Sequence, residues 1–290
     1  MLINFVFLFF VIHKLKLRYD NYALEQQLLH NNPLKKNFPL VRQKAKAFPQ
    51  KDSLWIFLMA GQSNMAGRAL VEPQDTLENP RILTLDQQGN WCYAKEPLHL
   101  DEPLFTGLDC GLSFARALLD SIPAGISIAL IPCAVGNSTL EHWLFNRSVR
   151  GIKLLDNFKE KVDWVQPYGT IKAVLWHHGE SNAKSNKMAH YATGLHGLID
   201  IFRMTIQLDS LPVLVGSLGS FAPTKAQQNN WNKLNQKLEE LAKKDRNIHL
   251  IQSHGLDHNG DHLHFNSIAQ RKMGRRFAEQ YWKHYCFTTQ

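Results

Sequence analysis

Cysteine is scarce in this sequence, and close cysteine pairs are missing. The 290 residues include four cysteines, none of which belongs to a CxxC pair. A zinc knuckle or a thioredoxin-like redox site is therefore not expected. Cys110 and Cys133 also lack an evident basic neighbour, and reactive thiols need an electropositive setting. We predict that both are structural, while the disulfide state and the compartment stay open.

A basic pattern is missing from most of the chain, although the formal net charge is +8. Residues 1–52 hold nine lysines and arginines against three acidic residues, so most of the charge belongs to this leader. The residues after it are nearly neutral, and they contain no basic helix and no aromatic pattern suited to stacking bases. Nucleic acid is therefore not expected as a partner.

No apolar run is long enough to cross a bilayer by itself. Residues 1–12 are almost wholly apolar, whereas a span needs about 20 such residues. No lysine or arginine precedes this run and no small-residue cleavage site follows it, unlike in a standard signal peptide. Lys14, Lys16 and Arg18 follow instead and can snorkel. We predict that residues 1–18 are an uncleaved anchor or a weak export signal, which favours a membrane-associated or exported protein over a cytoplasmic one.

A linker and then a single domain follow this segment. Residues 19–52 are largely polar and are interrupted by Pro33, Pro39 and Pro49, which is typical of a linker or of an arm packed on a domain surface. The domain is predicted over residues 53–290. Apolar runs predict strands at 54–59, 126–131, 171–176, 213–217 and 248–252. Helical spacing predicts helices at 111–121, 153–165, 187–208, 224–244 and 267–284, the last capped by Asn266 or Ser267.

This alternation predicts an α/β fold. Strands that alternate with helices form a mainly parallel sheet covered on both faces, here a three-layer α/β/α sandwich of about five strands. The carboxyl ends of parallel strands share one edge of the sheet, and ligands bind there. Functional residues are therefore expected directly after strands.

A serine and an Asp-x-x-His pair meet this expectation. Ser63 follows the first predicted strand in the segment GQSNMAG, where a strand-to-helix turn exposes a hydroxyl and favours an oxyanion at the helix start. Taken alone, this segment favours a capping serine in a tight turn. Asp261 and His264 follow the last predicted strand, and their spacing lets one loop present a base together with the acid that orients it.

Two further segments carry polar or glycine residues beside regular elements. His178 and Glu180 follow the third predicted strand in the segment HHGESN, an unusual ending for a purely structural strand. Gly111 opens the first long helix, and a glycine at that point frees a backbone N–H for an oxyanion.

The ordered set of motifs resembles a known enzyme family. GQSNMAG, GLSFA, GNSTLEHW, HHGESN and DHLHF are similar to the blocks of the sialate O-acetylesterase and acetylxylan esterase group, carbohydrate esterase family 6, within the SGNH hydrolase superfamily. The resemblance covers about residues 53–284. It implies a flavodoxin-like fold, no cofactor or metal, and an acetylated carbohydrate as substrate. His178 stands where the family often has glutamine, and Asn137 stands where a second glycine is usual.

The resemblance also implies a role for each matched residue. Ser63 is the nucleophile, His264 the base and Asp261 the acid that orients it. The N–H groups of Ser63 and Gly111 form the oxyanion hole, with His178 as a possible third donor. Glu180 is expected to brace the site rather than act as a second base. The residues expected to bind substrate or support the triad are Gln62, Asn64, Asn137, Trp143 and Glu180.

Two other functions remain open at this point. His254, His258 and His262, with Asp257 and Asp261, are residue types that bind zinc, so a metal-dependent hydrolase is one alternative. The other is a carbohydrate-binding module that kept the fold without the activity. A serine esterase differs from both alternatives because it has an activated serine.

Overall fold

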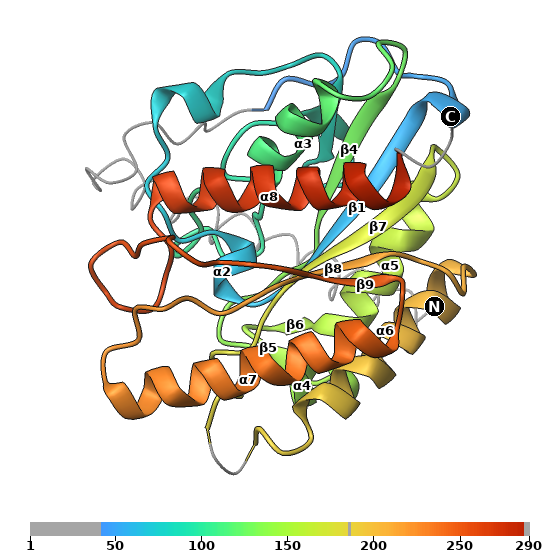
Figure 1. Ribbon diagram of the computed structural model, residues 1–290. Helices are drawn as coiled ribbons and strands as arrows, with labels where there is room; N and C mark the ends of the chain where they lie inside the picture. The colour runs from blue at the N-terminus through green and yellow to red at the C-terminus, as the bar shows by residue number, and fades with distance from the viewer. Residues whose placement is uncertain (1–41, 185–186, 287–290) are drawn as a thin grey trace, which may run out of the picture.

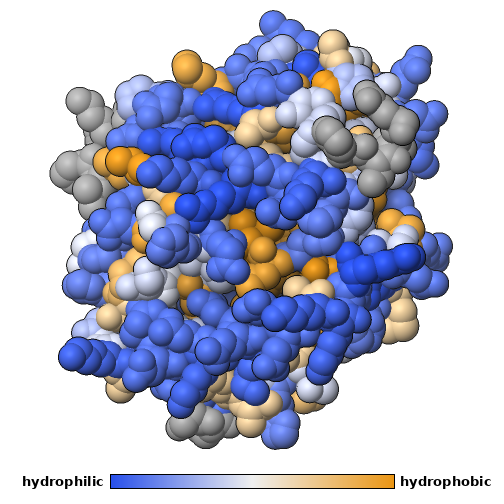
Figure 2. Space-filling view, in the orientation of Figure 1, coloured by the Kyte–Doolittle hydropathy of each residue, from blue (hydrophilic) through white to orange (hydrophobic). Residues whose placement is uncertain are grey.

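The structure is a computed structural model, and it describes residues 42–184 and 187–286. The predicted anchor or signal at residues 1–18 and most of the arm at 19–52 lie outside these ranges. Among the described residues, no helix has both the length and the apolarity to cross a bilayer. The face that carries α7 and α8 is largely hydrophilic, with apolar residues exposed in a limited central area (Figure 2). Membrane association of residues 1–18 therefore stays a prediction.

A seven-stranded sheet forms the centre of the molecule. Its strand order is β3-β2-β4-β1-β7-β8-β9, and every neighbouring pair is parallel except β2 and β3 (Figure 1). The strands are β1 (Leu54–Gly61), β2 (Ile82–Leu85), β3 (Trp91–Tyr93), β4 (Ser127–Pro132), β7 (Thr170–His177), β8 (Val213–Gly216) and β9 (Ile248–Ile251). This topology places the carboxyl ends of β1, β4 and β7 side by side.

The predicted α/β class is confirmed, but the predicted count of about five strands is too low. The five predicted strands correspond to β1, β4, β7, β8 and β9. The missed strands β2 and β3 have only 4 and 3 residues, too short for a periodic pattern to stand out. They extend the sheet beyond β4, where residues 42–46 join them through a bridge between Lys44 and Cys92. The described residues of the arm therefore pack on the domain.

Helices cover both faces of the sheet (Figure 1). One layer holds α3 (Gly111–Leu119) and α8 (Ser267–Tyr285), and the other holds α4 (Leu140–Leu144), α5 (Leu154–Val165), α6 (Tyr191–Ile206) and α7 (Lys225–Lys244). Short elements complete the fold: η2 (Lys51–Ser53), α2 (Ser63–Ala66), η3 (Pro73–Thr76) and a hairpin of β5 (Ser148–Val149) and β6 (Ile152–Lys153). The predicted helix at 187–208 begins only at Tyr191. Asn266 is the cap of α8, because its side chain accepts the Ala269 N–H.

The two faces of β1 explain its continuous apolar run. Leu54, Ile56 and Leu58 pack into the core beneath α4–α7, whereas Phe57 and Met59 pack into the core beneath α3 and α8. A strand buried on both faces has no solvent side that would select polar residues. This double burial holds the carboxyl end of β1 in a rigid position.

Close packing between α3 and α8 leads to a stability prediction. A Cβ on Gly274 of α8 would lie 2.3 Å from the Cys110 carbonyl oxygen, while a Cβ on Gly197 of α6 would meet nothing within 4 Å. We expect Gly274→Ala to lower the free energy of unfolding by about 1–3 kcal/mol, because the helices must separate. Gly197→Ala should raise it by about 0.5–1 kcal/mol through helix propensity. Urea unfolding monitored by circular dichroism measures both, and a Gly274→Ala variant as stable as Gly197→Ala would contradict this packing.

Candidate active site

The turn after β1 presents Ser63 at the sheet edge. Gly61 ends the strand with φ of 140°, and a Cβ there would lie 2.2 Å from the His177 carbonyl oxygen of β7. Only glycine fits this conformation and this close approach. Ser63 is the first residue of the short helix α2, and only 7% of its surface is exposed. The serine therefore stands on a strongly constrained strand-to-helix turn.

Ser63, His264 and Asp261 form one chain of hydrogen bonds. The Ser63 Oγ lies 2.9 Å from the His264 Nε2, and the His264 Nδ1 lies 2.6 Å from the Asp261 Oδ2. Ser63 and His264 are 201 residues apart in the sequence. They meet because the loops after β1 and β9 lie at the same edge of a parallel sheet. The three residues predicted from local motifs are thus brought together in space.

Charge and burial set the protonation states of this pair. Burial lowers the pKa of His264, and the nearby Arg68 cation lowers it further, while Asp261 acts in the opposite direction. For Asp261, partial burial opposes ionisation, but hydrogen bonds from the backbone and ring of His264 outweigh it and hold the pKa below its usual value. A neutral imidazole beside an ionised carboxylate is the state that a general base needs.

The neighbours of Ser63 tie the surrounding loops together. The Gln62 Oε1 accepts the N–H groups of Gly179 and Ser181 at 3.1 and 3.4 Å. The Asn64 side chain donates to the Glu180 carboxylate and to the Leu263 carbonyl, and it accepts the Phe265 N–H at 3.1 Å. Leu263 and Phe265 flank His264. Gln62 and Asn64 are almost fully buried, so both brace the loops instead of facing a substrate.

Glu180 is the buried carboxylate that accepts the hydrogen bond of the Asn64 amide. Burial raises the pKa of Glu180 to about 7, against about 4.3 for a free glutamate. At a pH below both pKa values, Glu180 is protonated in the folded and in the unfolded chain. Between them the unfolded chain loses its proton first, so it binds fewer protons than the folded chain. The free energy of unfolding must then fall as the pH rises through this window.

Glu180→Gln is expected to remove this pH dependence. Between pH 4.5 and 8 the native protein should lose about 3 kcal/mol more stability than the variant, since glutamine stays neutral. Urea unfolding at both pH values measures the difference. Glu160→Gln, at an exposed position, is the matched control and should behave as the native protein. Equal pH slopes for the native protein and Glu180→Gln would contradict the prediction.

The groups of Gly111 and His178 that were predicted to bind an oxyanion already have partners within the fold. The Gly111 N–H already donates to the Asp109 carboxylate at 2.6 Å, and a Cβ on Gly111 would strike the Met59 side chain in the core. Both ring nitrogens of His178 are engaged, with the Tyr191 hydroxyl and the Ser138 carbonyl. Burial lowers the pKa of His178 to about 3. Both groups are therefore engaged in hydrogen bonds within the fold.

Asn137 is a candidate oxyanion donor near Ser63. It lies in the loop after β4, the strand beside β1, and its φ is 61°. Asparagine tolerates this left-handed conformation better than most residues. The Ser138 Oγ donates to the Gly61 carbonyl at 3.2 Å, which joins this loop to the turn of Ser63. Among the described residues, the N–H groups of Asn137 and Ser63 have no hydrogen-bond acceptor. The adjacency of β1 and β4 would have identified this loop.

Trp143 lies in the core of the domain. It was predicted in a loop beside the site, but it lies in α4 and is fully buried. Its ring packs edge-on against Trp176 and near Phe202. Thr139 caps α4, and the helix turns this tryptophan into the core.

The histidines of the last loop hold its backbone. The His258 Nδ1 accepts the N–H groups of Gly260 and His262 at 3.0 and 3.1 Å. The His262 ring faces the Phe221 carbonyl instead of Ser63. In the part of the chain that the structure describes, no group of three or more His, Cys, Asp or Glu is arranged to hold a metal ion. The alternative metal site therefore has no geometric support.

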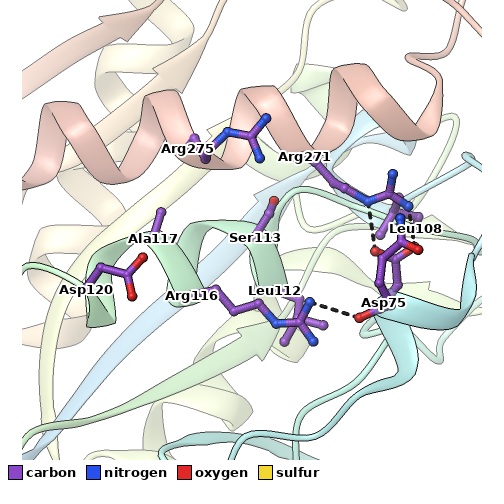
Figure 3. Close-up of a pocket in the computed structure, with 10 residues that line it drawn as sticks. Asp75, Leu108, Leu112, Ser113, Arg116, Ala117, Asp120, Arg271 and Arg275 are labelled. Carbon is purple, nitrogen blue, oxygen red and sulfur yellow. Dashed lines mark hydrogen bonds and ion pairs between the residues drawn. The ribbon is translucent and has the colours of Figure 1, made fainter.

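A cavity of about 220 Å³ lies away from Ser63, between α3, α8 and η3 (Figure 3). Arg271 turns toward Asp75 and donates to its carboxylate at 2.9 Å, and Arg116 donates to the backbone of Gln74 and Leu77. None of the predicted site residues lines this cavity. Its arginines join the helices to η3, and we assign it no part in the chemistry.

A family model described as "Carbohydrate esterase, sialic acid-specific acetylesterase" matches residues 53–283. A probable carbohydrate esterase of Arabidopsis thaliana is 29% identical over an alignment of 255 residues that covers 80% of this chain and 91% of that protein. The chain is also similar to a solved structure from Arabidopsis thaliana, with a TM-score of 0.70 and 28% identity over 80% of this chain and 99% of that one.

More distant structures share the fold. The structure of NanS has a TM-score of 0.60 and 18% identity, covering 81% of this chain and 98% of that one. A carbohydrate acetylesterase from Xanthomonas citri has a TM-score of 0.58 and 16% identity, covering 82% of this chain and 57% of that one. At these identities the likeness concerns the fold alone.

Proposed function

Since this chain belongs to the carbohydrate esterase family of sialic acid-specific acetylesterases, we propose that it removes O-acetyl groups through Ser63, His264 and Asp261. The protein is a carboxylic ester hydrolase that acts on acetylated carbohydrate. The observation that supports these three residues is their continuous chain of hydrogen bonds, 2.9 Å from serine to imidazole and 2.6 Å from imidazole to carboxylate.

The reaction proceeds in two half-reactions. The Ser63 Oγ attacks the acetyl carbonyl carbon while the His264 Nε2 takes its proton, and a tetrahedral oxyanion forms. This intermediate collapses when His264 returns the proton to the sugar oxygen, which leaves an acetyl ester on Ser63. Water then attacks this ester, with His264 again as the base, and acetate leaves. Asp261 orients the imidazole and stabilises its charged form in both halves.

The oxyanion hole is assigned to the N–H groups of Ser63 and Asn137. Both are unpaired among residues 42–184 and 187–286, and both lie on loops that the Ser138–Gly61 hydrogen bond joins. Donors held in place before the reaction cost no reorganisation when charge develops. Losing one such donor typically costs about 10²- to 10³-fold in rate.

Acetate release tests this function. Purified protein is incubated with O-acetylated sialic acid, acetylated xylan and a chromogenic acetyl ester, beside Ser63→Ala and a sample treated with chelator. We expect release from at least one acetylated glycan, loss in Ser63→Ala, and no effect of the chelator. Covalent labelling of Ser63 by an organophosphonate should accompany activity. Full activity in Ser63→Ala, or loss on chelation, would overturn the assignment in favour of the metal-dependent alternative.

Membrane association through residues 1–18 is a separate proposal that rests on sequence alone. A deletion of residues 1–18 is expected to reduce partitioning into membranes, because an apolar run followed by a basic cluster binds lipid surfaces. The protein without residues 1–18 should hydrolyse a chromogenic ester at the same rate as the full chain. Fractionation of cell lysates measures the first property, and unchanged partitioning after the deletion would exclude the anchor.

A further inference from the structure

A buried carboxylate lies between two arginines beside the loop of Asn137. Glu102 belongs to the segment that connects β3 to α3, and its side chain is 2% exposed. It accepts from the Arg68 Nη2 at 3.0 and 3.1 Å, from the Arg150 Nε at 3.0 Å, and from the Gly136 N–H. No sequence motif pointed to this residue. The Glu102 carboxylate thus contacts two guanidinium groups and one backbone N–H.

We propose that Glu102 is a positioning residue that holds the loop of residues 135–138 so that the Asn137 N–H faces the developing oxyanion. The inference rests on the proposed function, because it acts through the oxyanion hole assigned above. Glu102 touches no reacting atom, and its effect passes through the backbone of Gly136 and the charge of Arg68.

The loop is anchored on both sides of Asn137. On one side, the Gly136 N–H is bound by Glu102, and a Cβ on Gly136 would lie 2.0 Å from the Arg68 Nη2. The ion pair therefore packs directly against the backbone. On the other side, the Ser138 Oγ binds the Gly61 carbonyl and the Ser138 carbonyl binds His178. With both neighbours held, the left-handed Asn137 has little freedom to turn its N–H away.

The same carboxylate also balances charge near the base. Arg68 is close enough to His264 to lower its pKa, and Glu102 is the partner of Arg68. Arg150 comes from the turn of the β5–β6 hairpin, where its φ is 52°, and its guanidinium covers the Phe105 ring at 3.9 Å. Removing the charge of Glu102 leaves both cations unbalanced. The imidazolium of His264 then becomes harder to form.

Two substitutions separate the two effects. Glu102→Leu removes the hydrogen bond to the Gly136 N–H and both ion pairs. The value of kcat for a chromogenic acetyl ester should then fall about 10- to 100-fold, with KM changed less than about threefold, because the interaction is made in the transition state. Glu102→Gln keeps an acceptor for the Gly136 N–H but loses the charge. Its kcat should fall less, and its kcat/KM profile should shift to lower pH, since kcat/KM rises as His264 loses its proton. Glu239→Gln, the same change in an exposed ion pair on α7, is the control.

The outcomes distinguish this inference from the proposed function. Ser63→Ala is measured in parallel, and its full activity would refute the function itself. If Ser63→Ala is inactive while folded Glu102→Leu keeps the native kcat, only the role of Glu102 is refuted. If Glu102→Leu does not fold, Glu102→Gln decides, and a native kcat with an unshifted pH profile refutes the inference. A profile shifted to lower pH with reduced kcat supports it.

Discussion

Ser63→Ala and His264→Ala are each expected to lower kcat for an acetyl ester by about 10⁴- to 10⁶-fold, with the double variant little slower than either single one. The Ser63 Oγ and the His264 Nε2 share one hydrogen bond of 2.9 Å. Without the base the hydroxyl is a weak nucleophile, and without the hydroxyl the base has no proton to take. Residues that act as a unit give losses that do not multiply.

Turnover of a chromogenic acetyl ester at equal folded concentration measures this result. His262→Asn is the matched control, because His262 lies beside Asp261 but faces the Phe221 carbonyl. Its φ of 57° suits asparagine, so this variant should retain most activity. A double variant that loses the product of the two single losses would show that Ser63 and His264 act independently, and it would refute the mechanism.

Asp261→Asn is expected to lower kcat by about 10³- to 10⁴-fold while the loop stays folded. The Asp261 Oδ1 accepts the N–H groups of Leu263 and His264 at 2.9 and 2.8 Å, and an amide oxygen can keep these bonds. The amide nitrogen then replaces Oδ2 opposite the His264 Nδ1. Because that nitrogen is a donor, the imidazole adopts the tautomer that cannot take a proton from Ser63.

The test combines turnover with thermal unfolding. Asp257→Asn changes a more exposed carboxylate in the same loop and should leave kcat within about twofold, as expected of a surface position. Equal melting temperatures for both variants would show that the loss in Asp261→Asn is chemical. Near-native turnover by Asp261→Asn would mean that the carboxylate only shapes the loop.

Local features of the site could be predicted from the sequence. The DxxH spacing places Asp261 and His264 in one loop, and the structure separates their interacting atoms by 2.6 Å. The continuous apolar run before Ser63 identified β1 as a strand buried on both faces. Contact between Ser63 and His264 then required only the rule that parallel strands share one edge. Each of these steps depends on residues close together in the chain.

The surroundings of residues that depend on distant neighbours could not be predicted from the sequence. Trp143 and His178 were predicted at the site, but α6 supplies Phe202 and Tyr191, which bury them. A tryptophan or histidine carries no local signal that says whether a helix far along the chain will cover it. The short strands β2 and β3 were missed for a related reason, since pairing with β4, and not their own pattern, makes them strands.

The sequence by itself determined the α/β class and predicted the set of Ser63, His264 and Asp261, because hydrophobic period and residue spacing act over a few residues. The proposed oxyanion hole rests on the tertiary structure alone. Gly111 and Asn137 both lie in glycine-containing motifs, and the strand order favours Asn137 because it places β4 beside β1. Glu102 became visible in the same way, since Arg68, Gly136 and Arg150 meet it only when the sheet, the loops and the hairpin pack together. Such contacts arise from the packing energy of the whole domain, which no single segment encodes.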